Sequence, residues 1–321
     1  MKKRHLLAAA AALVMATSLH AQSASKPLRI VVSFAPGGPV DFTARTIAEP
    51  LGRALGRTVV IDNKPGANGA IGAAEVLRAD PDGSTLWITS VGAAAINQSL
   101  YEKLPYNMQR DFAPVSLVTN NVEVFVTAMK DPARDITEFL AAAKGRKESL
   151  PIASSGRGSI PHLALAQMES AVGIDFIHVP YNGMAPALND LLGGQVSGTF
   201  ADVAAVMGQI KGGRLKALGI AAPQRHPGLP DVKTFEEQGI RAMDTNNWYG
   251  LFASAKTPPA VLDALSKAVQ QAMADPAAAA KLLQAGAEPR SSSPQELAAL
   301  VKSDTEKWAR LIKSRNITAD Q

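Results

Sequence analysis

Residues 28–62, LRIVVSFAPGGPVDFTARTIAEPLGRALGRTVVID, decide the fold class of this 321-residue chain. An apolar run rich in Val and Ile, from Leu28 to Ser33, is typical of a buried strand, and a segment of helical period runs from Phe42 to Leu55. A second such strand, Thr58 to Asp62, precedes a helical segment through Ile71 to Ala79. Strands that alternate with helices predict an α/β fold, with a mostly parallel sheet and helices on its faces.

Two glycine-rich loops join predicted strands to the helices that follow them. The first is residues 34–41, FAPGGPVD, and the second is residues 154–162, SSGRGSIPH, after a strand near Ile152. The first amides of a helix have no intrahelical partner and the helix dipole places positive charge there, so such a loop suits an anion. Either loop alone is explained as a tight connection. Two of them facing each other across a cleft would hold a carboxylate from both sides.

These loops and further strand ends supply the candidate ligand-binding residues. Glycine lets the backbone approach a ligand closely, and serine hydroxyls suit carboxylate oxygens or local backbone bonds. Asp41 would bind a ligand amine or hydroxyl, or accept amides at the start of its helix, and His162 would donate to a ligand or tie down its loop. Tyr181 would form an apolar wall or pack in the core. The candidates are Phe34, Pro36, Gly37, Gly38, Asp41, Ser90, Ser154, Ser155, Gly156, Gly158, His162, Tyr181 and Asp202.

Two segments are expected to cross between lobes. Residues 115–129 have strand character but carry polar Thr119, Asn120 and Asn121 in their middle, which is too polar for one buried strand. Residues 241–249 form the second candidate crossing. The chain is therefore expected to build a discontinuous first lobe from residues 22–120 plus 248–321, and a second lobe from residues 121–247.

The amino terminus has the order of a secretory signal. Basic residues 2–4 precede an apolar run from Leu6 to Ala16, and small residues end at Ala21. We expect cleavage after Ala21, which makes residues 1–21 a signal peptide and places the mature protein in the periplasm. The apolar run is too short to span a bilayer and no later run is long enough, so no membrane-embedded segment is expected.

The composition excludes several classes of protein. The chain has no cysteine, so we expect neither a lipoprotein nor a disulfide-stapled domain. Three of its 33 basic residues lie in the leader, and the small excess over 28 acidic residues that remains argues against nucleic-acid binding. The five histidines do not cluster with carboxylates at metal-ligand spacing. No metal and no other cofactor are expected.

Several ordered motifs resemble the Bug receptors, the substrate-binding components of tripartite tricarboxylate transporters. They cover essentially the whole mature chain: the two glycine loops, residues 63–69 (NKPGANG), 179–183 (VPYNG) and 190–196 (DLLGGQV). The sequence departs from the family at Asn182, where members often have a basic residue, and at Ala201, where members often have an aromatic residue or an acid before the second-lobe aspartate.

The resemblance implies a type II-like periplasmic binding protein with a ligand cleft between two lobes, each a mixed sheet flanked by helices. It implies that residues 36–41 and 154–158 hold the carboxylate of the ligand, and that a tripartite tricarboxylate-type membrane permease receives it. The family's ligands include dicarboxylates, acidic amino acids, citrate-like and aromatic acids, so the resemblance leaves the individual ligand open.

Two other functions use the same residues. A ligand-sensing partner of a membrane sensor kinase would share the pocket, so the sequence does not separate sensing from transport. A periplasmic serine hydrolase would use Ser154 or Ser155 with His162 and Asp202, but the chain lacks the Gly-x-Ser-x-Gly turn that activates such a serine. We expect a monomeric binding protein that closes about a hinge on one ligand, and not an enzyme.

Overall fold

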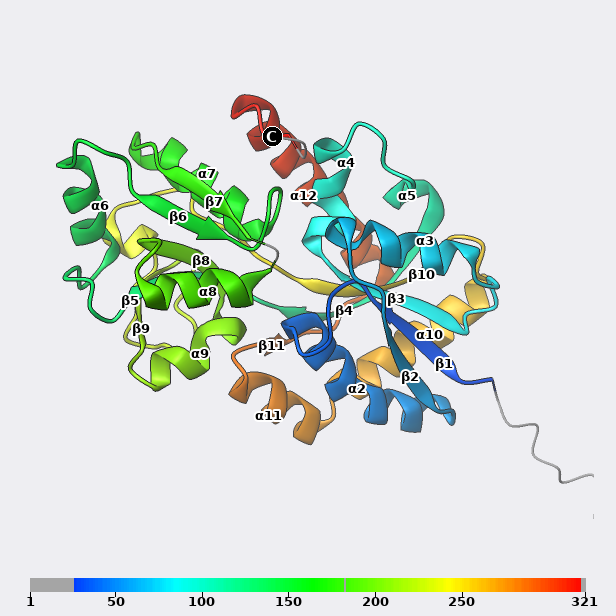
Figure 1. Cartoon of the computed structure of the whole chain (residues 1–321). Coiled ribbons are helices and arrows are strands. Elements are labelled where there is room, and N and C mark those ends of the chain that lie inside the picture. The colour runs from blue at the N-terminus through cyan, green and yellow to red at the C-terminus, as the bar shows by residue number, and fades with distance from the viewer. Residues whose placement is uncertain (1–25, 182, 319–321) are drawn as a thin grey trace, which may run out of the picture.

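The computed structural model describes residues 26–181 and 183–318, so the predicted leader lies outside the described residues. Figure 1 shows two lobes side by side, each a sheet flanked by helices. Both sheets contain parallel and antiparallel strand pairs. The predicted α/β class is confirmed. No helix among the described residues is long and apolar enough to cross a membrane.

The first lobe contains, in the described part of the chain, a six-stranded sheet in the order β11-β4-β10-β3-β1-β2. Its strands come from both ends of the chain: β1 (Leu28–Val32), β2 (Val59–Asn63), β3 (Thr85–Ser90), β4 (Phe112–Asn120), β10 (Tyr249–Ser254) and β11 (Glu288–Pro289). Its helices are α2 (Pro39–Leu55), η2 (Ala67–Gly69), α3 (Ala70–Arg78), η3 (Gly92–Ile96), α4 (Asn97–Leu100), α5 (Met108–Asp111), α10 (Pro259–Met273), α11 (Pro276–Gln284) and α12 (Pro294–Ser314).

The second lobe is built from the middle of the chain. Across its described residues the sheet has five strands in the order β7-β6-β8-β5-β9. The strands are β5 (Glu123–Ala128), β6 (Pro151–Ser154), β7 (Ile177–Pro180), β8 (Gly198–Asp202) and β9 (Leu215–Ile220). The helices are α6 (Ile136–Lys144), α7 (Ile160–Val172), α8 (Met184–Gly193), α9 (Val203–Lys211) and η4 (Glu236–Gln238).

The mixed sheets that the resemblance implies are confirmed, and in each lobe one strand between two neighbours of equal direction runs the opposite way. β10 runs antiparallel to both β3 and β4, and β5 runs antiparallel to both β8 and β9. The reason is the connectivity, because the chain enters and leaves the second lobe along these strands and must reverse direction there. The classical strand-helix-strand units remain parallel, as in β1 with β2 and β3.

The helix α2 shows how local sequence positions the first glycine loop. Its apolar residues Val40, Ala44, Ile47 and Leu51 recur at helical spacing and are almost fully buried. Burial of one such large side chain contributes about 1.5–3 kcal/mol, so this face fixes the helix on the sheet. Pro39 lies in the first turn, where its missing amide costs nothing, and the loop therefore ends at a fixed point beside the carboxyl end of β1.

Two crossing segments lie against each other where the lobes meet, as the teal and yellow ribbons of Figure 1 show. The Asn247 amide donates to the Asn121 carbonyl at 2.8 Å, and the Asn121 Nδ2 donates to the Asn247 carbonyl at 2.9 Å. The long apolar run predicted over residues 115–129 is divided between β4 and β5. Its polar middle forms part of the first crossing.

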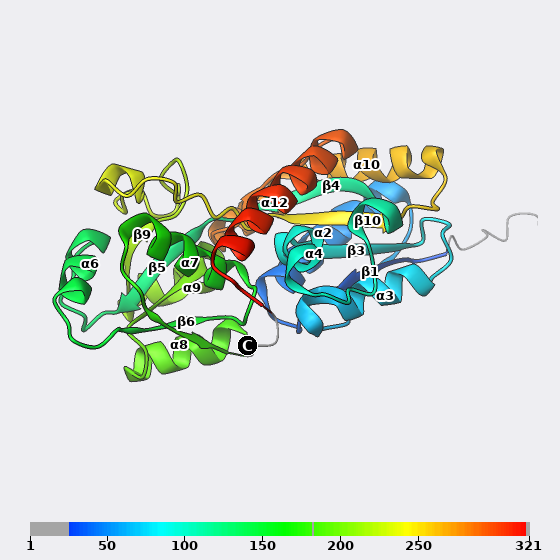
Figure 2. The same ribbon diagram turned by 90° about the horizontal axis from the view of Figure 1, so that it is seen from above.

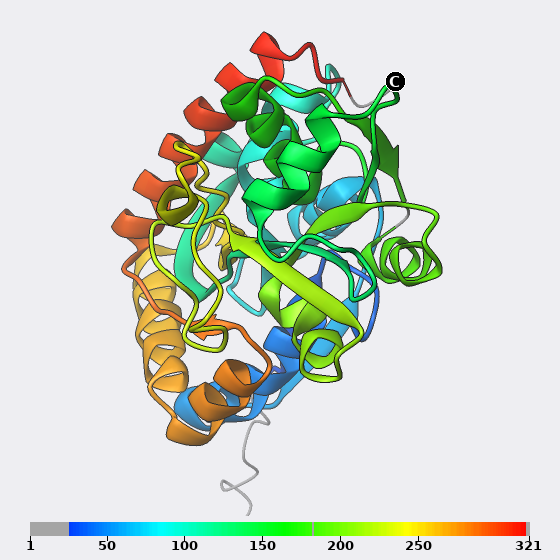
Figure 3. The same ribbon diagram turned by 90° about the vertical axis from the view of Figure 1, so that its left-hand side faces the viewer.

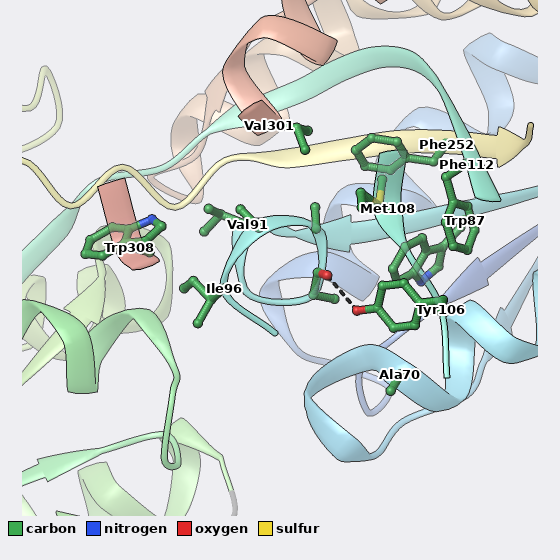
Figure 4. Packing of buried hydrophobic residues seen from close by; sticks show 14 of the residues in the cluster. Ala70, Trp87, Val91, Ile96, Tyr106, Met108, Phe112, Phe252, Val301 and Trp308 are labelled. Carbon is green, nitrogen blue, oxygen red and sulfur yellow. Dashed lines mark hydrogen bonds between the residues drawn. The ribbon is translucent and has the colours of Figure 1, made fainter. Parts of the chain in front are cut away.

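Hydrophobic packing also joins the two lobes. Figure 4 shows the aromatic part of one cluster, in which the Trp87 and Phe112 ring centroids lie 4.7 Å apart and the Tyr106 hydroxyl donates to the Ala93 carbonyl at 2.6 Å. The same cluster includes Ile160 and Leu163 of α7, a helix of the second lobe. A single buried cluster therefore draws on both lobes.

The helix α12 reaches from the first lobe to the second, as its red end beside the green α7 shows in Figures 2 and 3. Arg315, just after α12, pairs with Glu169 of α7 at 2.5 Å. The Trp248 indole donates to the buried Asp304 carboxyl at 2.6 Å, which ties α12 to the second crossing. The carboxyl-terminal helix thus contacts both lobes and the segment between them.

Candidate functional site

The first glycine loop is held in shape by one buried carboxylate. Asp41 is 2% exposed, and its Oδ2 accepts the Gly37 amide and the Arg45 Nε, each at 2.9 Å. The Nδ2 of Asn63, at the end of β2, donates to Asp41 Oδ1 at 2.9 Å and to the Phe34 carbonyl at 3.0 Å. The loop is therefore anchored at both ends to the neighbouring strand.

These bonds keep Asp41 ionised. Burial opposes its ionisation, but the hydrogen bonds from Arg45, Gly37 and Asn63 together outweigh burial and lower the pKa of Asp41. Both of its oxygens are engaged by the chain, which is the loop-holding role that the sequence left open beside ligand contact. The ligand contact itself stays a prediction. No side chain of the described residues caps α2 at Gly38, so its first-turn amides remain available to an anion.

Replacing Asp41 with asparagine is expected to lower the free energy of unfolding by about 1–3 kcal/mol at neutral pH, because charge-assisted hydrogen bonds to a buried group are lost. The native pKa is lowered, so the native state holds fewer protons than the unfolded state near the ordinary Asp pKa, and the contribution is present above that pKa and lost as the pH falls. Urea unfolding at pH 7 and at pH 3 checks this. A gap between variant and wild type that stays equal at both values would contradict it.

The second glycine loop is organised by two histidines. The His162 Nδ1 accepts the Gly158 amide at 3.0 Å, and the Ser154 Oγ and His178 Nε2 are hydrogen-bonded at 2.7 Å. The two imidazole rings stack with centroids 3.8 Å apart and planes 3° apart. Gly156 and Gly158 adopt φ angles of 136° and 69°, which only glycine reaches without strain. The backbone conformation of this loop therefore requires glycine at these two positions.

Both histidines are uncharged at neutral pH. Burial lowers the pKa of His162 to about 3, with further contributions from His178 and from the Arg157 charge. Burial and Arg157 lower the pKa of His178 to about 4. Because the Nδ1 of neutral His162 accepts a hydrogen bond, its Nε2 carries the hydrogen and can donate. His178 was missed by sequence reasoning, since it lies 24 residues from Ser154 on the next strand.

The remaining candidates lie at the same strand ends. Tyr181 follows β7, its amide donates to the Ser154 carbonyl at 3.0 Å, and its hydroxyl donates to Asp190 at 2.6 Å. Half-buried Ser155 belongs to this group, because its carbonyl accepts the Gly183 amide at 3.2 Å. In the first lobe Phe34 and Gly38 are half-buried, whereas Pro36 and Gly37 are exposed. Ser90, 7% exposed at the end of β3, accepts the Gly92 amide at 3.3 Å.

The second loop touches the opposite lobe. A Cβ placed on Gly158 would lie 2.0 Å from Cδ2 of Leu100, which is at the end of α4 in the first lobe.

The candidate residues of the two loops form two separate groups. One group contains Phe34, Pro36, Gly37, Gly38 and Asp41, and the other contains Ser154, Ser155, Gly156, Gly158, His162 and Tyr181. No hydrogen bond between described residues links these groups. Two surface hollows, of about 210 and 340 Å³, are lined by other residues, among them Lys147 and Tyr101.

Asp202 lies in a polar cluster at the crossings. Its Oδ2 accepts the Tyr249 hydroxyl at 2.5 Å and its Oδ1 accepts the Asn247 Nδ2 at 2.9 Å. Glu123 faces Asp202 across β5 and β8, is 0% exposed and receives Asn247 at 3.3 Å. Its Oε2 has no hydrogen-bond partner among the described residues. Burial, followed by the charge of Asp202, raises the pKa of Glu123 far above its ordinary value, which favours the protonated form of this acid in the native protein.

The cluster was only partly foreseen. Asp202 was a candidate, whereas Glu123 and Asn247 were not, although the polar residues inside the two crossings were a signal that something polar is buried there. The hydrolase alternative fails on geometry. Among the described residues His162 bonds Gly158, and Asp202 bonds Tyr249 and Asn247, so they do not form the proposed triad with Ser154 or Ser155. The hydrogen-bond partner of Ser154 is His178.

Comparison with known proteins identifies relatives over most of the chain. The model of the tripartite tricarboxylate transporter receptor family, TctC, matches residues 43–317. The structure of periplasmic binding protein BugD is 35% identical, with a TM-score of 0.83, and covers 92% of this chain and 99% of BugD. MatC (Rpa3494) from Rhodopseudomonas palustris, with bound malate, is 31% identical with a TM-score of 0.81 over 90% and 99%. R. palustris Rpa4515, with adipate, is 29% identical with a TM-score of 0.86 over 92% and 99%.

Proposed function

Because this chain belongs to the receptor family of the tripartite tricarboxylate transporters, whose members are solute-binding proteins and not enzymes, we propose that it captures a small carboxylate between its two lobes. It then delivers this ligand to a tripartite tricarboxylate-type membrane permease. Malate and adipate, which relatives of known structure hold, support this class of ligand. The protein works in the periplasm after its signal peptide, residues 1–21, has been removed, and it works as a monomer.

One observation carries the proposal: each lobe presents a glycine loop that leads into the amino terminus of a helix. In the first lobe the loop leads to α2, which lacks a side-chain cap, and in the second it leads to α7, where the Ser159 hydroxyl accepts the His162 amide and neutral His162 supplies an imidazole N–H. Amides and an imidazole N–H are donors that match carboxylate oxygens. The acids near these loops, Asp41 and Asp202, are already engaged, so they leave little unpaired negative charge to repel an anion.

The binding movement is a rotation of the lobes about the two crossings. We place the lobe boundaries there, so that the first lobe comprises residues 22–120 plus 248–321 and the second residues 121–247. Hydrogen bonds between Asn121 and Asn247 hold the two crossing segments together. The lobes are joined by these two segments, so bending there rotates one lobe against the other. Ligand contacts made from both lobes at once would favour the closed arrangement.

Small carboxylates are expected to stabilise the mature protein against heat. A ligand that binds only the native state adds about 2.7 kcal/mol at a hundred times its Kd. For a protein of about 300 residues that shifts Tm by about 4–5 °C. A thermal-shift screen of residues 22–321 against mono-, di- and tricarboxylates measures this, with the corresponding amides at equal concentration as the matched control. Shifts of equal size with the amides, or none with any acid, would contradict the proposal.

A further inference from the structure

Arg157 is a cation without an acidic partner in the loop between β6 and α7. Its side chain is exposed, and no described residue forms an ion pair with it. The arginine nearest to the first loop differs, because Arg45 is bound to Asp41 at 2.9 Å and to Asn63 at 3.2 Å. Of the two loops proposed to hold the ligand, only the second therefore carries a cation that the chain itself does not neutralise.

The backbone on both sides of Arg157 is held by hydrogen bonds. The Gly156 carbonyl accepts the Ser154 Oγ at 3.1 Å and the Ser159 Oγ at 2.6 Å, and the Gly158 amide donates to His162 Nδ1 at 3.0 Å. The Cα of Arg157 is thus fixed, whereas its side chain has no partner that fixes it. The preorganised backbone lowers the cost of ordering the residue on a ligand, and the unpartnered guanidinium can turn towards a carboxylate.

This loop lies where the second lobe meets the first. Gly158, the next residue, touches Leu100 of α4, and Ile160 at the start of α7 is buried in a cluster with Ile96 of the first lobe. A side chain at position 157 therefore starts at the boundary that the proposed ligand must occupy. The Gly158 amide donates to His162 Nδ1, so position 157 lies one residue from the histidine stack, and the charge of Arg157 contributes to the lowered pKa of both imidazoles.

The charge balance of the loop favours a second negative group on the ligand. Both histidines are neutral at physiological pH, so the positive charge of the second loop comes from Arg157. Asp190, which contacts Tyr181 beside this loop, already accepts the tyrosine hydroxyl. A ligand with one carboxylate on the helix amides would leave the guanidinium without an anion.

We propose that Arg157 selects dicarboxylates over monocarboxylates of equal length by taking the second carboxylate of the ligand. This assignment rests on the proposed carboxylate-binding function. The first carboxylate binds the amides at the helix amino terminus and His162 Nε2–H. The second carboxylate binds the planar guanidinium, whose parallel N–H groups match a carboxylate in bidentate geometry. Lysine at this position would keep the positive charge but lose the paired N–H groups that match a carboxylate.

Calorimetric titration with α,ω-dicarboxylates of three to six carbons, including malate and adipate, and with the monomethyl ester of each acid tests the assignment. The unmutated protein is expected to bind at least one diacid about tenfold more tightly than its ester, as charge-assisted hydrogen bonds allow. In Arg157→Gln the affinity for the diacid is expected to fall by about that factor, and the affinity for the ester by less than about twofold. Arg157→Lys should lie between them.

Arg146→Gln is the matched control, because Arg146 is an exposed arginine of the same lobe before the amino end of β6. It is expected to leave both affinities unchanged. Equal binding of diacid and ester by the unmutated protein, or equal losses for both in Arg157→Gln, would overturn the role of Arg157 alone. If none of the diacids and esters bound, both this assignment and the proposed carboxylate function would fall.

Discussion

Replacing Gly158 with alanine is expected to weaken ligand binding by more than about thirtyfold while both lobes stay folded. The residue has a φ of 69°, which costs an L-residue about 1–2 kcal/mol, and its new Cβ would lie 2.0 Å from Cδ2 and 3.1 Å from Cγ of Leu100. Relief of that overlap adds about 1–3 kcal/mol. Leu100 is 5% exposed and has little room to move, so the second loop must withdraw from the first lobe. Calorimetric titration of the ligand found by the thermal screen measures the loss.

Gly37→Ala provides the matched control. Gly37 has a φ of 82°, so the backbone strain is similar, but nothing lies within 4 Å of the new Cβ. We expect a loss of at most about tenfold there. The double variant Gly158→Ala with Leu100→Ala should recover part of the affinity of Gly158→Ala, since it removes the overlap and leaves the strain. Equal losses in Gly37→Ala and Gly158→Ala would show that contact between the lobes at Leu100 plays no part.

Local sequence patterns predicted the elements of the first units well. The strand and helix expected at 28–33 and 42–55 are β1 and α2, and those expected at 58–62 and 71–79 are β2 and α3, with ends that differ by at most three residues. The helix α2 begins earlier than expected because Pro39 can occupy the first turn of a helix. Hydrophobic period and turn residues are local properties, and these elements are fixed by local properties.

Strand direction and long-range pairing were beyond the reach of the sequence. An antiparallel and a parallel buried strand have the same apolar composition, so β5 and β10 gave no sign of their direction. The buried polar cluster at the crossings shows the same limit. Asp202 and Glu123 are 79 positions apart and meet only because β5 pairs with β8, and Asn247 joins them from the other crossing. A single buried acid could be suspected from sequence, but not its partner.

Replacing Glu123 with glutamine is expected to flatten the pH dependence of stability. Glutamine has the shape of the protonated acid and can donate an N–H to Asp202. Burial raises the native pKa of Glu123 above its unfolded value, so between the two the native state holds a proton that the unfolded state has lost. The contribution of Glu123 to stability is thus fully present below the ordinary Glu pKa of about 4.3 and is lost as the pH rises towards the native pKa. As the pH rises, the free energy of unfolding of the variant should increase relative to that of wild type by up to about 1.4 kcal/mol per pH unit.

Urea unfolding of wild type and Glu123→Gln at several values between about pH 5 and about pH 8 measures this difference, with the exposed Glu148→Gln as the control for loss of one carboxylate. Glu148→Gln should run parallel to wild type. Tyr249→Phe, which removes a donor to Asp202 and leaves Glu123 in place, should lower stability and keep the slope. Parallel curves for Glu123→Gln and wild type would mean that the buried pair carries no extra proton and that Glu123 is ionised in the native protein. The Asp202 and Glu123 charges would then have to be balanced by a cation at the crossings, since two adjacent buried carboxylates without a proton or a counterion repel each other strongly.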